Sequence, residues 1–157
     1  MSYIIKKMTQ KHAIEILTWK YEKPYDFYNN VLSGDALLEL QNGSYRTVHS
    51  PTRELIGFFC FGSSAQVHSK NHKEIYKDNC LDIGIGMKPE RTGQGNGHLF
   101  FANILQCIEE EFPKSVIRLT VASFNKRAIH LYEKFNFVQV HEFSNSRATF
   151  ITMIKKK

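Results

Sequence analysis

Residues 80–112 of this chain, CLDIGIGMKPERTGQGNGHLFFANILQCIEEEF, predict a strand, a glycine-rich turn and a helix in that order. From position 81 to position 87 the odd positions are apolar, whereas the even positions hold Asp82 and two glycines. A strand turns successive side chains to opposite faces, so one face is apolar and the other is nearly bare apart from one carboxylate. Glycine in a strand marks a bulge or a close approach by another backbone or a ligand. An edge strand with incidental glycines is the alternative.

The turn that follows, Arg91-Thr92-Gly93-Gln94-Gly95-Asn96-Gly97, holds three glycines in five positions. Beyond it, apolar residues recur every fourth position from Phe100 to Phe112, which is the pattern of one apolar helix face, and Pro113 ends the helix. A turn that opens a helix presents unpaired backbone N–H groups at the positive end of the helix dipole. The stretch therefore predicts an anion site, because glycines leave these amides accessible to a phosphate.

The spacing of the glycines indicates which anion is bound. A dinucleotide-binding fingerprint needs a glycine where His98 stands, and the Gly-Lys-Ser/Thr of a P-loop is missing. The turn instead resembles the acyl-CoA pyrophosphate loop of the GNAT superfamily of N-acyltransferases, Q/R-x-x-G-x-G/A, through Gly95 and Gly97 preceded by Gly93. The chain departs from this pattern at Thr92, which occupies the Gln/Arg position, with an arginine one residue earlier.

A second motif, NKRAIHLYEKFNF, runs from Asn125 to Phe137, where the sequence predicts a helix over about 125–135. Asn125 and Tyr132 are seven residues apart, two helical turns, so they share one face. The segment is similar to the second GNAT motif, N-x-x-A-x-x-L-Y-x-x-x-G-F, and departs from it at Asn136, which can still adopt the left-handed conformation of a helix end. Alone, Tyr132 is more typical of a core tyrosine with a satisfied hydroxyl. The glycine-rich turn and this segment follow each other in the order found in the GNAT superfamily, and together they favour membership of that superfamily over a core role for Tyr132.

The resemblance implies a mixed, GNAT-like α+β fold, with a central sheet of about six to seven strands flanked by about four helices. It implies that residues 1–157 form a single domain that transfers an acetyl group from acetyl-CoA to a primary amine, by direct attack in a ternary complex. The residues implied to bind the cofactor are Ile85 and Met87 through their backbone, Thr92, Gly93, Gln94, Gly95, Asn96 and Gly97 through the loop amides, Asn125, and Tyr132 near the thioester sulfur. Tyr132 is also implied as the acid that protonates the leaving thiolate.

Direct attack by an amine needs a base for the ammonium proton, donors for the oxyanion and an acid for the thiolate. Asp82 is the candidate base, because it is the one carboxylate on the bare strand face. A solvated or salt-bridged carboxylate is an equally good interpretation of Asp82, and a water chain is the alternative route for the proton. The sequence places no histidine beside Cys80, so a cysteine nucleophile is not expected.

The composition bears on the remaining classes of function. A net charge of +6 and 42% hydrophobic residues suit one domain with a core and a polyanionic ligand. The basic residues form no stripe and no recognition motif appears, so we do not expect a nucleic-acid partner. Without a membrane-spanning run, a signal peptide or C-x-x-C spacing among its three cysteines, the chain is predicted to be cytoplasmic, with reduced thiols and no membrane partner. A catalytically silent acyl-CoA sensor and a homodimer both remain open.

The acceptor is expected to be a small-molecule or protein amine, whose identity the sequence does not reveal. The stretch from Trp19 to Tyr28 holds five aromatic residues, which either pack two helices together or line the acceptor side, since aromatic faces attract ammonium groups. The loop over 62–79 is the alternative location. His68 and His72 in that loop have the spacing of a metal-binding pair on a helix, but no carboxylate or cysteine supports them, so no metal is expected.

The rest of the chain predicts short elements. Strands are expected at 3–8, 45–49, 54–61, 116–121, 137–142 and 147–154. Thr9 is expected to cap a first helix, and Pro24 suits the first turn of a short second helix.

Overall fold

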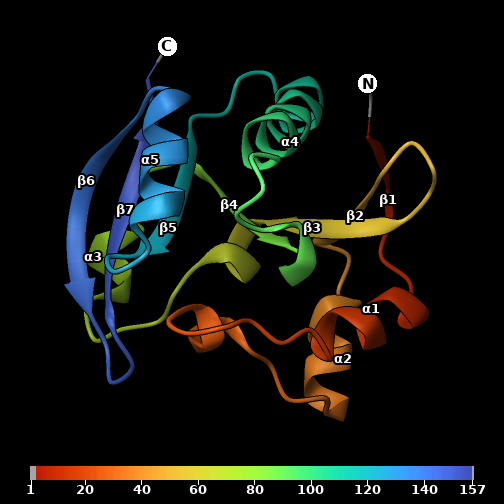
Figure 1. The fold of residues 1–157 in the computed structure, drawn as a ribbon. Coiled ribbons are helices and arrows are strands. Elements are labelled where there is room, and N and C mark those ends of the chain that lie inside the picture. The colour runs from red at the N-terminus through yellow and green to blue at the C-terminus, as the bar shows by residue number, and fades with distance from the viewer. Residues whose placement is uncertain (1–2, 157) are drawn as a thin grey trace. The chain divides into compact units, whose positions relative to one another are not determined.

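The structure is a computed structural model that describes residues 3–156. Its elements follow the order β1 (Ile4–Lys7), α1 (Gln10–Leu17), α2 (Gly34–Leu40), β2 (Tyr45–His49), β3 (Leu55–Phe61), α3 (His72–Ile75), β4 (Leu81–Met87), α4 (Gly97–Glu111), β5 (Ile117–Ala122), α5 (Lys126–Lys134), β6 (Phe137–Ser144) and β7 (Thr149–Lys155) (Figure 1). Single 3-10 turns occur at Tyr25–Tyr28, Gly62–Ala65 and Pro89–Arg91.

Seven strands form one mixed sheet in the order β1-β2-β3-β4-β5-β7-β6. The pair β4–β5 is parallel, whereas β1–β2, β2–β3, β5–β7 and β6–β7 are antiparallel. The chain divides into two compact units: the first holds residues up to Cys60 and Ile85–Cys107, and the second holds Phe61–Gly84 and the chain from Ile108 onward. Strand β4 therefore contributes its last three residues to the first unit and its first four to the second.

The expected α+β class with a mixed sheet and about four helices is confirmed, since four of the five described α-helices have seven residues or more. The prediction of a short second helix that begins at Pro24 is wrong. Pro24 precedes only one 3-10 turn, and the helix begins ten residues later, where the Ser33 side chain accepts a hydrogen bond from the backbone N–H of Ala36. The expected loop over 62–79 also contains the four-residue helix α3.

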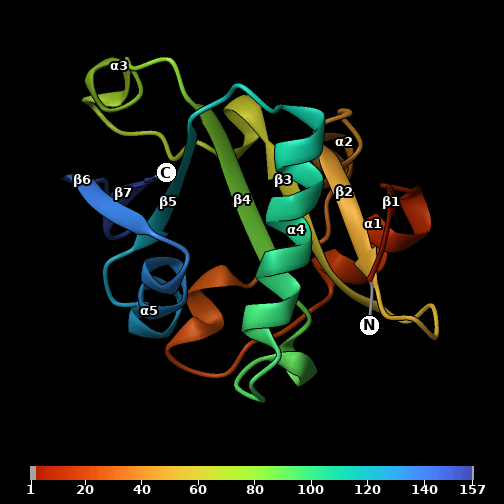
Figure 2. The same ribbon diagram turned by 90° about the horizontal axis from the view of Figure 1, so that it is seen from above.

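The first unit has its core between α1, α2 and β3. Thr9 caps α1 as predicted, with its side chain accepting from the His12 N–H, and the apolar face of α1 is buried. The buried residues of this cluster are Ala13, Ile16, Leu17, Trp19, Leu40 and Leu55. Helix α4, which lies along the strands in Figure 2, packs Phe100 so tightly on Gly57 of β3 that a Cβ there would approach the ring to 2.5 Å. Glycine is needed here to let helix and strand approach each other.

The second unit joins the first half of β4 to β5, β7 and β6. The parallel register sets Asp82 opposite Arg118 and ends at Ile83 and Leu119. Helix α5 is capped by the Asn125 side chain and is followed by Asn136 at φ 69°, the left-handed helix end that the sequence predicts. No helix among the described residues has the length and apolar character needed to cross a membrane.

Candidate functional site

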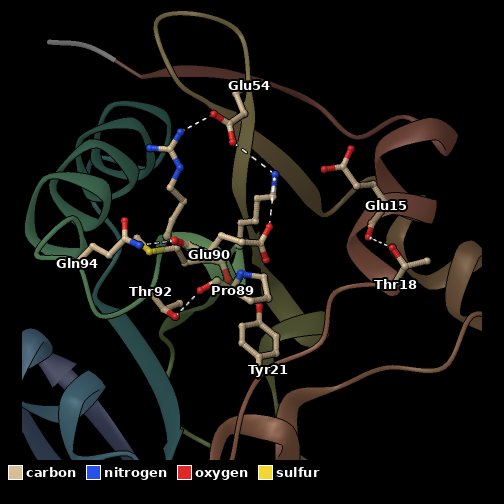
Figure 3. A network of polar contacts seen from close by, with 11 residues as sticks. Glu15, Thr18, Tyr21, Glu54, Pro89, Glu90, Thr92 and Gln94 are labelled. Atoms are coloured by element: carbon tan, nitrogen blue, oxygen red, sulfur yellow. Dashed lines mark hydrogen bonds and ion pairs between the residues drawn. The ribbon is translucent and has the colours of Figure 1, made fainter.

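The glycine-rich loop over 92–97 belongs to the first unit and is shaped by its own side chains. The Thr92 hydroxyl donates to the Pro89 carbonyl at 2.7 Å, and the Gln94 side-chain amide donates to the Glu90 carbonyl at 2.7 Å (Figure 3). Gly93 and Gly95 adopt left-handed φ angles of 70° and 77°, a conformation that costs glycine little. The chain thus makes two tight turns before α4 begins at Gly97.

The donors that this loop offers an anion are its backbone N–H groups. The hydroxyl and the backbone N–H of Thr92 both already donate to the Pro89 carbonyl, so the free backbone donors begin at Gly93. The departure from Gln/Arg at Thr92 also leaves no long side-chain donor there. Around Gly95, apart from the glycine and its two chain neighbours, no atom of the described chain lies within 4 Å of the place where a Cβ would stand. An open loop at the start of a helix of 15 residues combines accessible amides with the positive end of a helix dipole.

Glu54, the residue before β3, holds the two cations that flank this loop. Its carboxylate pairs with Arg91 and, at 3.4 Å, with Lys88, as the dashed lines of Figure 3 show. The hydrogen bond from Arg91 holds the pKa of Glu54 below its usual range, with smaller contributions from Lys88. All three side chains are partly exposed, so these pairs orient the cations and contribute little to folding. The sequence offered no sign of this contact between positions far apart in the chain.

A side chain from the N-terminal part of the chain holds the end of β4, a contact that the sequence did not predict. The Tyr21 hydroxyl donates to the Met87 backbone carbonyl at 2.7 Å, and Figure 3 shows its ring pointing up to the Pro89 turn. Burial, with a smaller contribution from the Glu90 charge, raises the pKa of Tyr21 well above its usual range. The phenol is therefore a hydrogen-bond donor at any physiological pH. The sequence placed Tyr21 only among five aromatic residues that either pack two helices together or line the acceptor side.

Asp82 lies in the second unit as one half of a buried ion pair. Asp82 is 3% exposed and Arg118 is 2% exposed, and the guanidinium donates to both carboxylate oxygens at 2.6 and 2.8 Å. Gln66 donates to the same carboxylate at 2.8 Å. The hydrogen bond to Asp82 raises the pKa of Arg118. This geometry favours the salt-bridged alternative for Asp82. A lone charge in each of two apolar strands was the available signal for the pair.

Arg118 also holds the loop over 62–79 in place. Its guanidinium lies 5.0 Å from the ring centroid of Tyr76 and donates to the Asp78 carbonyl at 3.4 Å. The Tyr76 hydroxyl bonds Thr120 at 2.8 Å and accepts from the Val67 N–H. These contacts form a polar network within the second unit, in which each of these groups has a partner.

Asn125 and Tyr132 both belong to the α5 motif, and the structure gives each a local role. The Asn125 side-chain oxygen accepts from the Ala128 N–H at 3.1 Å, which makes it the N-cap of the helix. Tyr132 is 7% exposed, and its ring centroid lies 6.1 Å from that of Phe137. Of the predicted site residues, Asp82, Asn125 and Tyr132 thus lie in the second unit, and Ile85, Met87 and the loop lie in the first.

The aromatic stretch divides into core and partly exposed residues. Trp19 is 7% exposed and belongs to the core of the first unit, as the packing interpretation expects. No residue of the turn Tyr25–Tyr28 is fully buried. In the other expected region, helix α3 begins only at His72, so the stacked rings of His68 and His72 do not share a helix. Within residues 3–156 no cluster of three or more His, Cys, Asp or Glu side chains forms a candidate metal site.

The fold is similar to those of several solved acetyltransferases. AAC(6')-Ib in complex with ribostamycin and coenzyme A aligns with a TM-score of 0.76 at 14% identity, over 100% of this chain and 94% of that one. A GNAT-family acetyltransferase from Bordetella pertussis gives a TM-score of 0.74 at 14% identity, covering 98% and 95% of the two chains. A chimera of the spermidine N-acetyltransferase SpeG from Vibrio cholerae and hSSAT gives 0.70 at 22% identity, covering 99% and 95%.

At these identities the solved structures demonstrate the fold alone. Among curated proteins no sequence matches this chain. The model of the acetyltransferase (GNAT) family, however, matches residues 10–137, which include both the glycine-rich loop and the motif on α5. This chain therefore belongs to the GNAT family of acetyltransferases.

Proposed function

We propose that this protein transfers the acetyl group of acetyl-CoA to a primary amine by direct attack in a ternary complex, with residues 1–157 as one catalytic domain. The observation that carries the proposal is the loop over 92–97, whose left-handed glycines leave open backbone amides at the start of α4. Such a loop suits the pyrophosphate of acetyl-CoA, because its backbone N–H groups donate hydrogen bonds to phosphate oxygens and the positive end of the helix dipole attracts their negative charge. The family match supports this choice of anion.

Further roles in cofactor binding follow the family pattern. The amides of Gly93, Gln94, Gly95, Asn96 and Gly97 bind the pyrophosphate, and the backbone of Ile85 and Met87 bonds the pantetheine arm. The Thr92 N–H, expected from the sequence as a further donor, already donates to the Pro89 carbonyl at 3.2 Å. Asn125, besides capping α5, contacts the same arm. The proposed reaction uses no metal.

The chemistry requires two proton transfers. The amine nitrogen forms a bond to the thioester carbon, the carbon–sulfur bond breaks, and the electron pair leaves on sulfur. We assign Tyr132 as the acid that protonates this thiolate. The ammonium proton leaves through Asp82 or through a water chain, and the pairing of Asp82 with Arg118 and Gln66 favours water. A carboxylate whose oxygens already accept three hydrogen bonds has less lone-pair capacity left to take up the ammonium proton.

We infer that the acceptor is a small cationic amine, in the class that includes polyamines and aminoglycosides. SpeG is named a spermidine N-acetyltransferase, and AAC(6')-Ib was solved with ribostamycin. Although the whole chain has a net charge of +6, residues 10–40 hold five acidic residues and three lysines. A local excess of acid beside partly exposed aromatic rings attracts ammonium groups.

The experiment that tests this function measures thiol release from acetyl-CoA with a panel of amines, namely spermidine, an aminoglycoside, a free lysine and a peptide with a free N-terminus. Thiol release that depends on one of the amines, together with a mass increase of one acetyl group on that amine, is the expected result. Acetyl-CoA binding by calorimetry without thiol release on any amine would instead establish the silent sensor. If acetyl-CoA does not bind at all, both functions are excluded.

A further inference from the structure

The hydrogen bond between Tyr21 and Met87 joins two parts of the first unit that have separate roles in the proposed function. Tyr21 lies in the aromatic stretch from Trp19 to Tyr28. Met87 is the last residue of β4 and lies 66 positions further along the chain than Tyr21. The contact joins that segment to the strand expected to carry the cofactor.

The direction of the Met87 carbonyl follows from the peptide that it shares with Lys88. The Lys88 N–H donates to the Ile56 carbonyl of β3 at 2.8 Å. In a planar trans peptide the C=O and N–H groups point in opposite directions, so the Met87 carbonyl points to the edge of β4 that does not face β3. The pairing between β4 and β5 along that edge ends at Ile83. Tyr21 therefore bonds the last carbonyl on the edge of β4 that β5 leaves unpaired, and this carbonyl belongs to Met87, whose backbone is proposed above to bond the pantetheine arm.

The segment that carries Tyr21 is closed on itself. The backbone N–H of Tyr21 donates to the Asn29 side-chain oxygen at 2.7 Å, and the Lys20 ammonium donates to the Asn30 carbonyl at 3.1 Å. Residues 21–29 thus form a loop whose two ends are tied together. The phenol of Tyr21 then ties this loop to β4, so that the position of the loop depends on the position of the strand edge.

We propose that Tyr21 is a positioning residue that fixes the Met87 end of β4 for acetyl-CoA and couples cofactor binding to the order of the loop over 21–29. This inference rests on the proposed function. With the hydroxyl in place, the edge of β4 is already ordered when the pantetheine arm arrives. Without it, part of the binding free energy is used to order the edge, the loop over 21–29 is no longer tied to the strand, and the affinity for acetyl-CoA falls.

The test compares Tyr21→Phe with Tyr45→Phe. Tyr45 is a matched control in the same unit, because it is also half-buried and its hydroxyl also donates one hydrogen bond, to Glu39 at 2.9 Å. We expect Tyr21→Phe to raise both Kd and KM for acetyl-CoA by about two- to tenfold, the value of one net hydrogen bond, with kcat nearly unchanged. Tyr45→Phe should leave all three constants near those of the wild type.

A second measurement separates positioning from a loss of stability. Hydrogen exchange of the amides over 21–29 should slow when acetyl-CoA binds the wild type, and the slowing should disappear in Tyr21→Phe at saturating acetyl-CoA. Asn29→Ala, which leaves the phenol intact but unties the loop, should weaken the slowing as well. Equal acetyl-CoA affinities in the two tyrosine variants, or unchanged slowing in Tyr21→Phe, overturn the proposal. A wild type that does not bind acetyl-CoA overturns the proposed function together with it.

Discussion

At the residue scale, Gly95 tests whether the loop binds the cofactor. Gly95→Asp introduces a side chain and a negative charge where the phosphates are proposed to lie, so acetyl-CoA affinity should fall at least tenfold in calorimetry, about the effect of one close like-charge contact. Gly43→Asp is the matched control, because both glycines have positive φ angles, 77° and 95°, and open space where a Cβ would be added. Both variants should lose similar stability, on the order of 1–2 kcal/mol. Unchanged acetyl-CoA affinity in Gly95→Asp would falsify the assignment of the loop.

Tyr132 distinguishes an acetyltransferase from a protein that only binds acyl-CoA. Tyr132→Phe keeps the ring that packs against Phe137 and removes only the proposed acid. Turnover should therefore fall by about 10²–10⁴-fold, the usual contribution of a general acid, while acetyl-CoA affinity stays close to that of the wild type. The measurement is steady-state thiol release alongside calorimetry, with Tyr45→Phe as the control. Full turnover in Tyr132→Phe would make Tyr132 a packing residue.

Asp82 and Arg118 should behave as a structural pair. Removing one partner leaves the other charge buried and uncompensated, so Asp82→Asn and Arg118→Met should each cost about 3–5 kcal/mol of folding stability in urea unfolding. If a water chain carries the amine proton, the folded Asp82→Asn enzyme keeps the pH–rate profile of the wild type. A rate that falls selectively at low pH in Asp82→Asn would instead identify Asp82 as the base.

At the scale of the elements, the approach of α4 to β3 depends on glycine. A Cβ on Gly57 would lie 2.5 Å from the Phe100 ring and 2.7 Å from the Gly86 carbonyl oxygen, and a backbone oxygen cannot move aside as a side-chain end can. Gly57→Ala should therefore lower the free energy of unfolding by about 1–3 kcal/mol. Gly34→Ala is the control, because its added carbon would stand in open space and alanine favours a helix. A neutral Gly57→Ala would show that α4 does not pack this closely.

Strand β4 shows how one element serves two roles. Its first residues pair in parallel with β5 and carry Asp82, while its last residue is held by Tyr21. The two halves belong to different compact units of the chain. Two glycines share a face of β4 with Asp82. Packing requires a glycine at Gly86 at least, because a Cβ there would meet the Phe58 ring at 2.3 Å.

For the molecule as a whole, folding stability should fall on acidification. His49 is 3% exposed, and burial lowers its pKa, with further contributions from His12 and Lys6 that outweigh the opposing effects of the Arg53 backbone and Glu15. The unfolded chain then binds a proton at a pKa of about 6.5 that the folded chain does not yet bind. The stability from neutral His49 is therefore complete above about pH 6.5 and is lost as the pH falls below it. Thermal melts between about pH 8 and pH 5 measure this slope.

His49→Gln serves as the comparison, because glutamine can still bond the Thr47 hydroxyl that His49 contacts at 2.9 Å. The variant should show a shallower loss of melting temperature with falling pH than the wild type. Identical slopes would assign the acid sensitivity to other groups.

The sequence by itself determined the features that depend on local pattern. The bounds of β2 and β4, the glycine-rich loop, the buried face of α4 and the left-handed Asn136 all follow from side-chain period and turn chemistry within about ten neighbouring residues. Family membership follows from two such local motifs.

Only the tertiary structure decided which distant groups meet. Arg118 pairs with Asp82 from 36 positions away because the parallel register of β4 and β5 sets them opposite each other. Tyr21 reaches Met87 across 66 positions because a loop tied by Asn29 folds back onto the strand. Such contacts depend on register, on chain direction and on the packing of whole elements, and none of these is encoded in the spacing of neighbouring residues.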